Sequence, residues 1–342
     1  MNNILLFPLN EYWWFYLGFT LMVIVMLVVD LSVFNRKAHT IGFREALVAT
    51  TAWMSLAAIF NFGFYRYALW KFSTDARLQA IPGFNAALEA KEAALEFLSG
   101  YVVEQTLSVD NMFVFVLVFA YFRIPPQYQH RTLFYGILGA IIFRSIFIAL
   151  GSLLLGYTWV IWLFGGFLVF TGVKMLFGDD DDQPDLEKNL LLQTVRRFIP
   201  VTGQLYGPKF FISDQGRRVA TPLFLTLVLL EASDVIFAVD SVPAIFALTR
   251  EPLIVYTSNI FAILGLRSMY FLLAGAVHRF YLLRYGLSII LVFIGLKMAW
   301  LNQVYEGHFP TGLSLGIIFG VLGLSIGLSL AFPKKQPMST GA

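Results

Sequence analysis

Two apolar stretches of this sequence carry carboxylates beside amide or hydroxyl side chains. They read "VVEQTLSVDNMFVF" and "LLEASDVIFAVDSVPAIFAL". Their acidic and polar members are Glu104, Asp110, Asn111, Glu231, Asp234, Asp240 and Ser241. A carboxylate near the middle of a bilayer costs roughly 2.5–3.5 kcal/mol on insertion scales, so these groups need cations or water. An all-oxygen set of this kind suits Mg²⁺, Ca²⁺ or Mn²⁺ rather than copper or zinc.

The spacing separates a central pair of acids from the others. Residues six positions apart lie about 240° apart around an α-helix, so Glu104 and Asp110 do not share a face. We interpret Asp110 and Asp240, each followed by an amide or hydroxyl residue, as the metal-binding centre. The three other acids are further candidate ligands, a neighbouring site or a proton path. Pro243 cannot donate to the carbonyl of Val239, which leaves an extra oxygen beside Asp240.

Four basic residues also fall inside apolar runs. They are Arg144, Lys174, Arg267 and Lys297. We expect these bases to pair with the carboxylates as buried scaffolding, or to act in gating, because ten unpaired charges would cost on the order of 25–35 kcal/mol. If all ten ionise, the net charge is about −2, which one divalent cation neutralises. Asp30, near the end of the first run, either joins this set or merely caps its helix and reaches the interface.

The charged residues recur in the same order, which indicates an internal duplication. A pair of acids spaced by five residues is followed by an arginine and, thirty residues later, by a lysine in both halves. The residues around the two lysines, "FTGVKM" and "FIGLKM", also match. Three membrane spans make one copy. Because three is odd, the second copy must cross the membrane in the opposite sense, and inverted repeats place a substrate site near the midplane.

Composition predicts the environment of these repeats. The chain is 58% hydrophobic and 13% charged, about half the charged fraction of a soluble domain, with a mean hydropathy of +0.73. Apolar runs of about 20 residues, long enough to cross about 30 Å of hydrocarbon, predict an all-α polytopic membrane protein with nine spans. The spans are expected near 14–34, 45–65, 99–121, 133–155, 158–178, 221–248, 253–275, 283–301 and 311–332.

The predicted organisation has five parts. Residues 1–98 hold two spans and an amphipathic outer segment, 99–178 the first repeat, 179–220 a loop, 221–302 the second repeat, and 303–342 the last span and a tail. One set of connections carries 15 Lys and Arg residues and the other 5. The positive-inside rule therefore predicts an outer N-terminus and a cytoplasmic C-terminus.

The loop 179–220 opens with "DDDDQPD". We interpret this acidic run as a solvated segment that lacks the spacing of an EF-hand; gathering of cations is the alternative. A protein partner docking on this loop stays open.

Several functions are disfavoured by what the sequence lacks. It contains no cysteine, which excludes thiol catalysis and thiolate ligation. None of its four histidines falls within a predicted span, which weighs against haem and zinc, and there is no P-loop motif for ATP. We therefore expect no enzymatic activity, no tightly bound cofactor and no nucleic-acid partner. A secondary transporter and a non-transport membrane scaffold remain.

Four motifs, "EQTLSVDNMFVF", "EASDVIFAVDSVPAIFA", "SNIFAILGLRSMYFLL" and "LVFIGLKM", resemble the TerC family of bacterial membrane proteins and its Alx-like branch. The resemblance covers residues 10–332. It implies a bacterial inner-membrane protein with a 3+3 inverted core like that of the lysine-exporter superfamily, a link to tellurium-resistance operons, and export of Mn²⁺ as the transported substrate.

The same resemblance assigns the seven acidic and polar residues of the two opening stretches to the metal site. Ligand chemistry alone leaves Mg²⁺, Ca²⁺ and Fe²⁺ open. Proton exchange through Glu231 or Asp234 is one way in which export could be coupled. A scaffold that partners metal-stress or tellurite-resistance proteins is the alternative function.

Overall fold

The computed structural model describes residues 5–30, 41–154, 157–177, 193–194, 197, 199–214, 217–274, 282–305 and 309–332. Within them the side chains of Asp110, Phe113, Thr158 and Asp240 are not described. The helices and strands are α1 Leu9–Val29, α2 Phe43–Thr74, α3 Ala76–Gln79, α4 Ala86–Tyr121, α5 Pro126–Leu154, α6 Thr158–Phe177, β1 Phe211–Asp214, β2 Arg217–Ala220, α8 Pro222–Phe246, α9 Pro252–Ala274, α10 Leu283–Leu296, α11 Asn302–Val304 and α12 Thr311–Ala331. A π-helical turn, Lys297–Leu301, follows α10.

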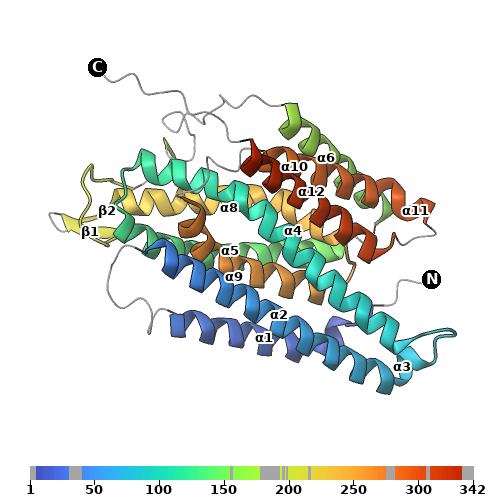
Figure 1. The fold of residues 1–342 in the computed structure, drawn as a ribbon. Coiled ribbons are helices and arrows are strands. Elements are labelled where there is room, and N and C mark those ends of the chain that lie inside the picture. Colours follow the sequence, from blue (N-terminus) through green and yellow to red (C-terminus); the bar gives the residue numbers. More distant parts are fainter. Residues whose placement is uncertain are drawn as a thin grey trace.

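The described chain forms a bundle of long helices that lie side by side (Figure 1). Nine of the described helices are long and apolar enough to cross a membrane, which confirms the predicted polytopic helical membrane protein. Helices are the expected form because hydrocarbon offers no partner for a free N–H or C=O, so each segment bonds its own backbone.

The bundle has two ends, which we name by the small elements that lie there. The hairpin face carries the antiparallel strands β1 and β2, and the α3 face carries α3 (Figure 1). Helices α1, α4, α6, α9 and α12 run from the α3 face to the hairpin face, and α2, α5, α8 and α10 run back. The hairpin was not predicted from the sequence. The run "DDDDQPD" lies outside the described residues.

The stretch 66–98, expected to be an amphipathic outer segment, is largely helical and continues the helices on either side of it. Helix α2 continues to Thr74 and α4 begins at Ala86, so the predicted boundary at residue 99 falls inside a continuous helix. The physical reason is local. Alanine, glutamate, lysine and leucine fill this stretch and are strong helix formers, and the Asn85 side chain caps α4 by accepting from the backbone N–H groups of Ala87 and Leu88 at 3.1 and 3.2 Å.

Helix α9 lies at the centre of the bundle and packs against α2, α4 and α5. Its residues from Leu253 to Ser268 are buried without interruption. Aromatic rings from several helices close around it; Phe60 of α2 and Phe261 of α9, for example, have centroids 4.8 Å apart. Large apolar side chains such as Val25, Leu153 and Phe177 are exposed on the outside, as expected of a surface that faces lipid tails.

Helices α6 and α10 make reciprocal close contacts through two glycines of the matched segments. A Cβ atom at Gly172 would lie 2.8 Å from the carbonyl oxygen of Ser288, and one at Gly295 would lie 2.7 Å from that of Gly165. Ser288 and Gly165 each stand seven residues before the matched glycine of their own helix. A two-fold axis between the repeats would produce this exchange of roles. The inverted repeat itself stays a prediction.

Candidate functional site

Arg144 of α5 stands at the centre of the described charge cluster. Its guanidinium donates from Nε and Nη2 to both carboxylate oxygens of Asp234 on α8, at 3.2 and 2.8 Å. Its Nη1 donates to Oε1 of Glu104 on α4. Arg144 and Glu104 are fully buried and Asp234 is 4% exposed. One arginine therefore joins three helices and compensates two buried carboxylates, and such compensation is needed because an unpaired buried charge is very costly.

Protein donors occupy all four oxygens of these two carboxylates. The second oxygen of Glu104 accepts from Nδ2 of Asn259 on α9 at 3.1 Å, and Ser108 lies 3.5 Å from the first. Arg144 takes both oxygens of Asp234. Glu104 and Asp234, two of the predicted metal ligands, are thus engaged by Arg144 in this structure. A cation that bound these oxygens would lie close to the positive charge of Arg144.

The polar residues beside the predicted central pair are both buried, and one of them contacts the same cluster. Asn111 and Ser241 are each 2% exposed, and Ser241 Oγ lies 3.4 Å from Nη1 of Arg144. Asp110 and Asp240 immediately precede them in α4 and α8, but the structure does not describe the side chains of these two aspartates. Among the residues whose side chains are described, which leaves out Asp110 and Asp240, no three acidic or histidine groups gather to hold a metal ion.

Glu231 lies apart from Arg144, against α5. A Cβ atom at Gly139 would be 2.1 and 2.2 Å from its two carboxylate oxygens, so only glycine allows this approach. Its Oε2 is buried and has no hydrogen-bond partner among the described residues. Among the predicted acidic ligands whose side chains are described, Glu231 is therefore the one that has a carboxylate oxygen without a hydrogen bond.

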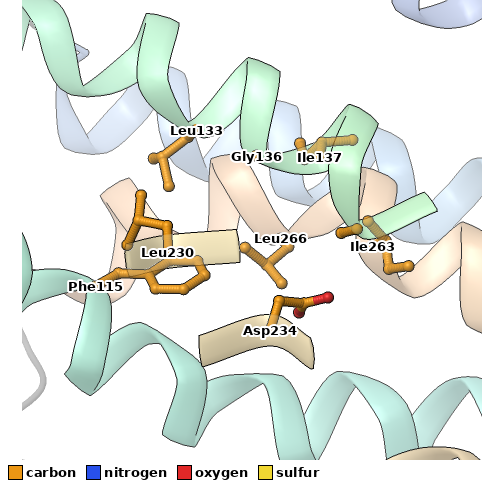
Figure 2. Close-up of a pocket in the computed structure, with 9 residues that line it drawn as sticks. Phe115, Leu133, Gly136, Ile137, Leu230, Asp234, Ile263 and Leu266 are labelled. Carbon is orange, nitrogen blue, oxygen red and sulfur yellow. The ribbon is translucent and has the colours of Figure 1, made fainter. Parts of the chain in front are cut away.

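A small cavity lies beside Asp234 (Figure 2). Its lining residues Phe115, Leu133 and Leu230 stand on the hairpin-face side of Glu104, Arg144 and Asp234 in α4, α5 and α8. Its volume of about 20 Å³ is room for one water molecule. Asp234 is surrounded there by apolar side chains, and the cavity opens where Gly136 of α5 has no side chain. In the predicted repeat Gly136 matches Asn259, which fills the corresponding place beside Glu104. The lining residues are Phe115, Leu133, Gly136, Ile137, Ala140, Leu230, Asp234, Ile263 and Leu266.

The second arginine, Arg267 of α9, turns away from this cluster. It donates from Nη2 to Oδ2 of Asp30, the half-buried residue at the end of α1. Its Nη1 has no hydrogen-bond partner among the described residues. In this structure Asp30 pairs with a buried arginine as well as ending α1.

The two predicted lysines differ from each other. Lys297, which begins the π-helical turn, is 1% exposed and its Nζ has no hydrogen-bond partner among the described residues. The carboxylates of Glu96 and Glu92 on α4 interact with it electrostatically. Lys174 departs from the expectation of a buried pair, because its side chain is exposed in the last turn of α6. A lysine so near a helix end can extend its ammonium group to the interface.

The α3 face holds a buried carboxylate that the sequence did not indicate. Glu251, between α8 and α9, accepts from the backbone N–H groups of Leu6 and Phe7 at 2.6 and 3.1 Å. Burial raises its pKa to about 7, although these two hydrogen bonds and the charge of Arg77 lower it. The neighbouring Thr249 donates to Glu96. Glu251 therefore fastens the first described residues of the chain to the α8–α9 connection.

Sequence reasoning missed three contributors to the site. Asn259 supplies an amide to Glu104, and Gly136 and Gly139 make room beside Asp234 and Glu231. An isolated asparagine in the apolar run "SNIFAILGLRSM" was a usable signal, since polar groups inside spans face partners within the bundle. The glycines gave no comparable signal, because what a missing side chain leaves room for depends on the neighbouring helix.

A helical bundle with nine candidate spans among its described residues and a buried ion cluster inside it is a polytopic integral membrane protein. Residues 89–337 match the integral membrane protein TerC family. The chain belongs to the TerC family.

Relatives match over nearly the full length. An uncharacterized membrane protein of Myxococcus xanthus is 48% identical over 94% of this chain and 93% of its own length. An Escherichia coli K12 protein provisionally named membrane-bound redox modulator Alx is 45% identical over 89% of this chain and 90% of its own. A membrane protein of Rickettsia bellii is 35% identical over 90% and 94%. No solved structure matches the chain.

Proposed function

We propose that this protein is a secondary transporter that exports a divalent cation, Mn²⁺, from the bacterial cytoplasm through an acidic site between α4 and α8. The observation that carries the proposal is the buried cluster in which Arg144 compensates Glu104 and Asp234. A membrane protein gains little stability from such a cluster, because replacing buried ion pairs by apolar residues is often neutral or stabilising. Ionisable groups within spans therefore indicate function.

In this proposal Arg144 serves as an internal cation. When no metal ion is bound, its guanidinium neutralises the carboxylates of Glu104 and Asp234. A divalent cation held by the oxygens of Asp110, Asp240 and their neighbours Asn111 and Ser241 would repel the guanidinium and compete for the same acids. Hard divalent cations prefer such oxygen ligands. The choice of Mn²⁺ over Mg²⁺, Ca²⁺ and Fe²⁺ rests on the family alone.

The export direction rests on the family resemblance, and the predicted orientation says only which face of the bundle would be the cytoplasmic one. The positive-inside rule places the hairpin face in the cytoplasm and the N-terminus outside the inner membrane. The cavity beside Asp234 then lies on the cytoplasmic side of the cluster, and the acids Glu96 and Glu251 lie toward the exit. Glu231, with one unpartnered oxygen, is a better candidate than Asp234 for carrying a coupled proton.

The reciprocal contacts of Gly172 and Gly295 support the inverted repeat on which this transport mechanism depends. Inverted repeats carry substrate near the midplane at the repeat interface. The relatives' name refers to redox modulation. Because this chain has no cysteine, we place any such effect downstream of the metal that it moves.

The test is Mn²⁺ flux into proteoliposomes that contain the purified protein. Wild type is compared with Asp110→Asn/Asp240→Asn, under pH gradients of either sign and with Mg²⁺ and Ca²⁺ as competitors. Glu11→Gln, whose side chain is 44% exposed on α1, is the matched control. We expect flux in wild type and control and its loss in the double variant. Absence of flux from folded wild type would overturn the proposal in favour of a scaffold.

A further inference from the structure

Arg144 and Arg267 occupy matched places in the predicted repeats but have different partners. Arg144 donates to Glu104 and Asp234, whereas Arg267 donates to Asp30. Asp30 belongs to α1, which lies outside both repeats. The first repeat has no counterpart of α1 beside Arg144 among the described contacts. One extra helix therefore distinguishes two arginines that the duplication would make equivalent.

The cavity beside Asp234 lies next to both arginines along their helices. Ala140 of α5 and Ile263 of α9 both line it, and each stands four residues before an arginine. Residues four apart share a face of an α-helix and are separated by about one turn, or about 6 Å along the axis. Arg144 and Arg267 thus project from the two cavity-lining helix faces, and Arg267 lies one turn from the cavity that adjoins Asp234.

The donor groups of Arg267 are incompletely used. Arg267 is only 8% exposed, and its Nη1 is buried without a hydrogen-bond partner among the described residues. Buried guanidinium donors are normally satisfied. An orphaned donor is expected where a side chain is held in one of two positions and completes its hydrogen bonds in the other.

We propose that Arg144 and Arg267 exchange places at Glu104 and Asp234 during the transport cycle, and that Asp30 is the positioning residue that holds Arg267 away in this structure. The proposal rests on the transport function proposed above. In each end state of the exchange one arginine compensates the two acids, so neither end state leaves them as unpaired buried charges, and the transported cation takes that place while one arginine replaces the other. The proposal assigns to α1, which is outside the repeats, the role of setting which state is populated.

The exchange predicts which surfaces open and close. In this structure the cavity lies beside Asp234 and is lined by Ile137. In the exchanged state the matched cavity would open beside Glu104, toward the α3 face, and its corresponding lining residue is Ile260. The two isoleucines are 4% and 0% exposed, so they form a matched pair of reporters.

Single cysteines at these positions can test the exchange, because the chain has none of its own. Ile137→Cys and Ile260→Cys are each made in the wild-type and Asp30→Asn backgrounds, and labelling by a membrane-impermeant maleimide is measured from each side of oriented vesicles. Removing the partner of Arg267 should raise labelling at Ile260→Cys from the α3 face and lower it at Ile137→Cys. We expect the ratio of the two rates to change on the order of tenfold.

Two controls make the outcome specific. Glu11→Gln, the same chemical change on the same helix, should leave both rates unchanged. In an Arg267→Gln background, Asp30→Asn should not change the ratio of the two labelling rates further, because the proposal assigns the effect of Asp30 on that ratio to its contact with Arg267. Unchanged rates in folded Asp30→Asn protein, or an equal effect in the Arg267→Gln background, would overturn the proposal. Labelling needs no metal, so Mn²⁺ flux measured in wild-type vesicles tests the transport function separately.

Discussion

Replacing Arg144 by glutamine should destabilise the protein by about 3–5 kcal/mol, the usual effect of removing one partner of a buried ion pair. The magnitude of this destabilisation follows from the two buried carboxylates that remain without their cation. Glu104 and Asp234 are 0% and 4% exposed, and they would lose three charge-assisted hydrogen bonds from the guanidinium. Each such bond contributes roughly 1.5–3 kcal/mol, so even partial loss reaches that range.

Thermal unfolding in detergent measures this effect. For a large chain, 1 kcal/mol shifts Tm by about 2 °C, which predicts a decrease of about 6–10 °C. Arg131→Gln on the same helix is the matched control. Arg131 is exposed and lies over the rings of Tyr135 and Phe210 at 5.9 and 5.5 Å, an interaction worth about 0.5–1 kcal/mol at an exposed site.

A second variant tests the cause. Adding Glu104→Gln and Asp234→Asn to Arg144→Gln removes the stranded charges, and most of the lost stability should return. If Arg144→Gln lowers Tm no more than Arg131→Gln, the arginine does not compensate these acids. If the triple variant is as unstable as Arg144→Gln, the loss comes from packing, and the electrostatic reasoning is refuted.

Two further predictions concern other parts of the bundle. Because burial raises the pKa of Glu251 to about 7 from its usual range, folding should favour its protonated form. The unfolding free energy should then decrease by up to about 3 kcal/mol between about pH 4.5 and pH 7. In denaturant titrations Glu251→Gln should make this dependence of the unfolding free energy on pH weaker. An unchanged pH dependence in that variant would contradict the raised pKa. Gly295→Ala should lower the unfolding free energy by about 1–3 kcal/mol through overpacking against Gly165. Gly316→Ala, which has open space around it, should not lower it. Equal melting temperatures of the two variants would show that α6 and α10 can separate freely.

The spans were predictable because their signal is local. About 20 consecutive apolar residues must form a helix in hydrocarbon whatever surrounds them, so the nine runs needed no tertiary information. The sequence indicated helix before residue 99 but not its continuity with the span, because the composition of α4 changes at residue 99 while its helix propensity does not. The strands of the hairpin are too short to give a recognisable alternation of polar and apolar residues. The pairing of Phe211 with Ala220 also joins residues on opposite sides of a turn.

The need for charge compensation was also predictable, but the partners were not. Counting buried charges shows that Arg144 must meet acids, whereas its choice of both Glu104 and Asp234 depends on the side-by-side packing of α4, α5 and α8. Arg267 looked equivalent in sequence. Its pairing with Asp30 depends on where α1 docks, and no spacing rule within one helix could indicate that contact.

The occupied carboxylates change how the acidic motifs should be understood. A list of ligands predicts that every acid binds metal directly, yet each oxygen of Glu104 and Asp234 already accepts a hydrogen bond from a protein donor. In the proposed mechanism a cation displaces Arg144 from them, so their role is to exchange one positive charge for another. A site that exchanges cations stays near neutral both empty and loaded, and a low-dielectric interior favours such a site because net charge there is costly. On this view the second arginine is an expected feature of the duplicated bundle, since a guanidinium that leaves the acids must be replaced by another positive charge.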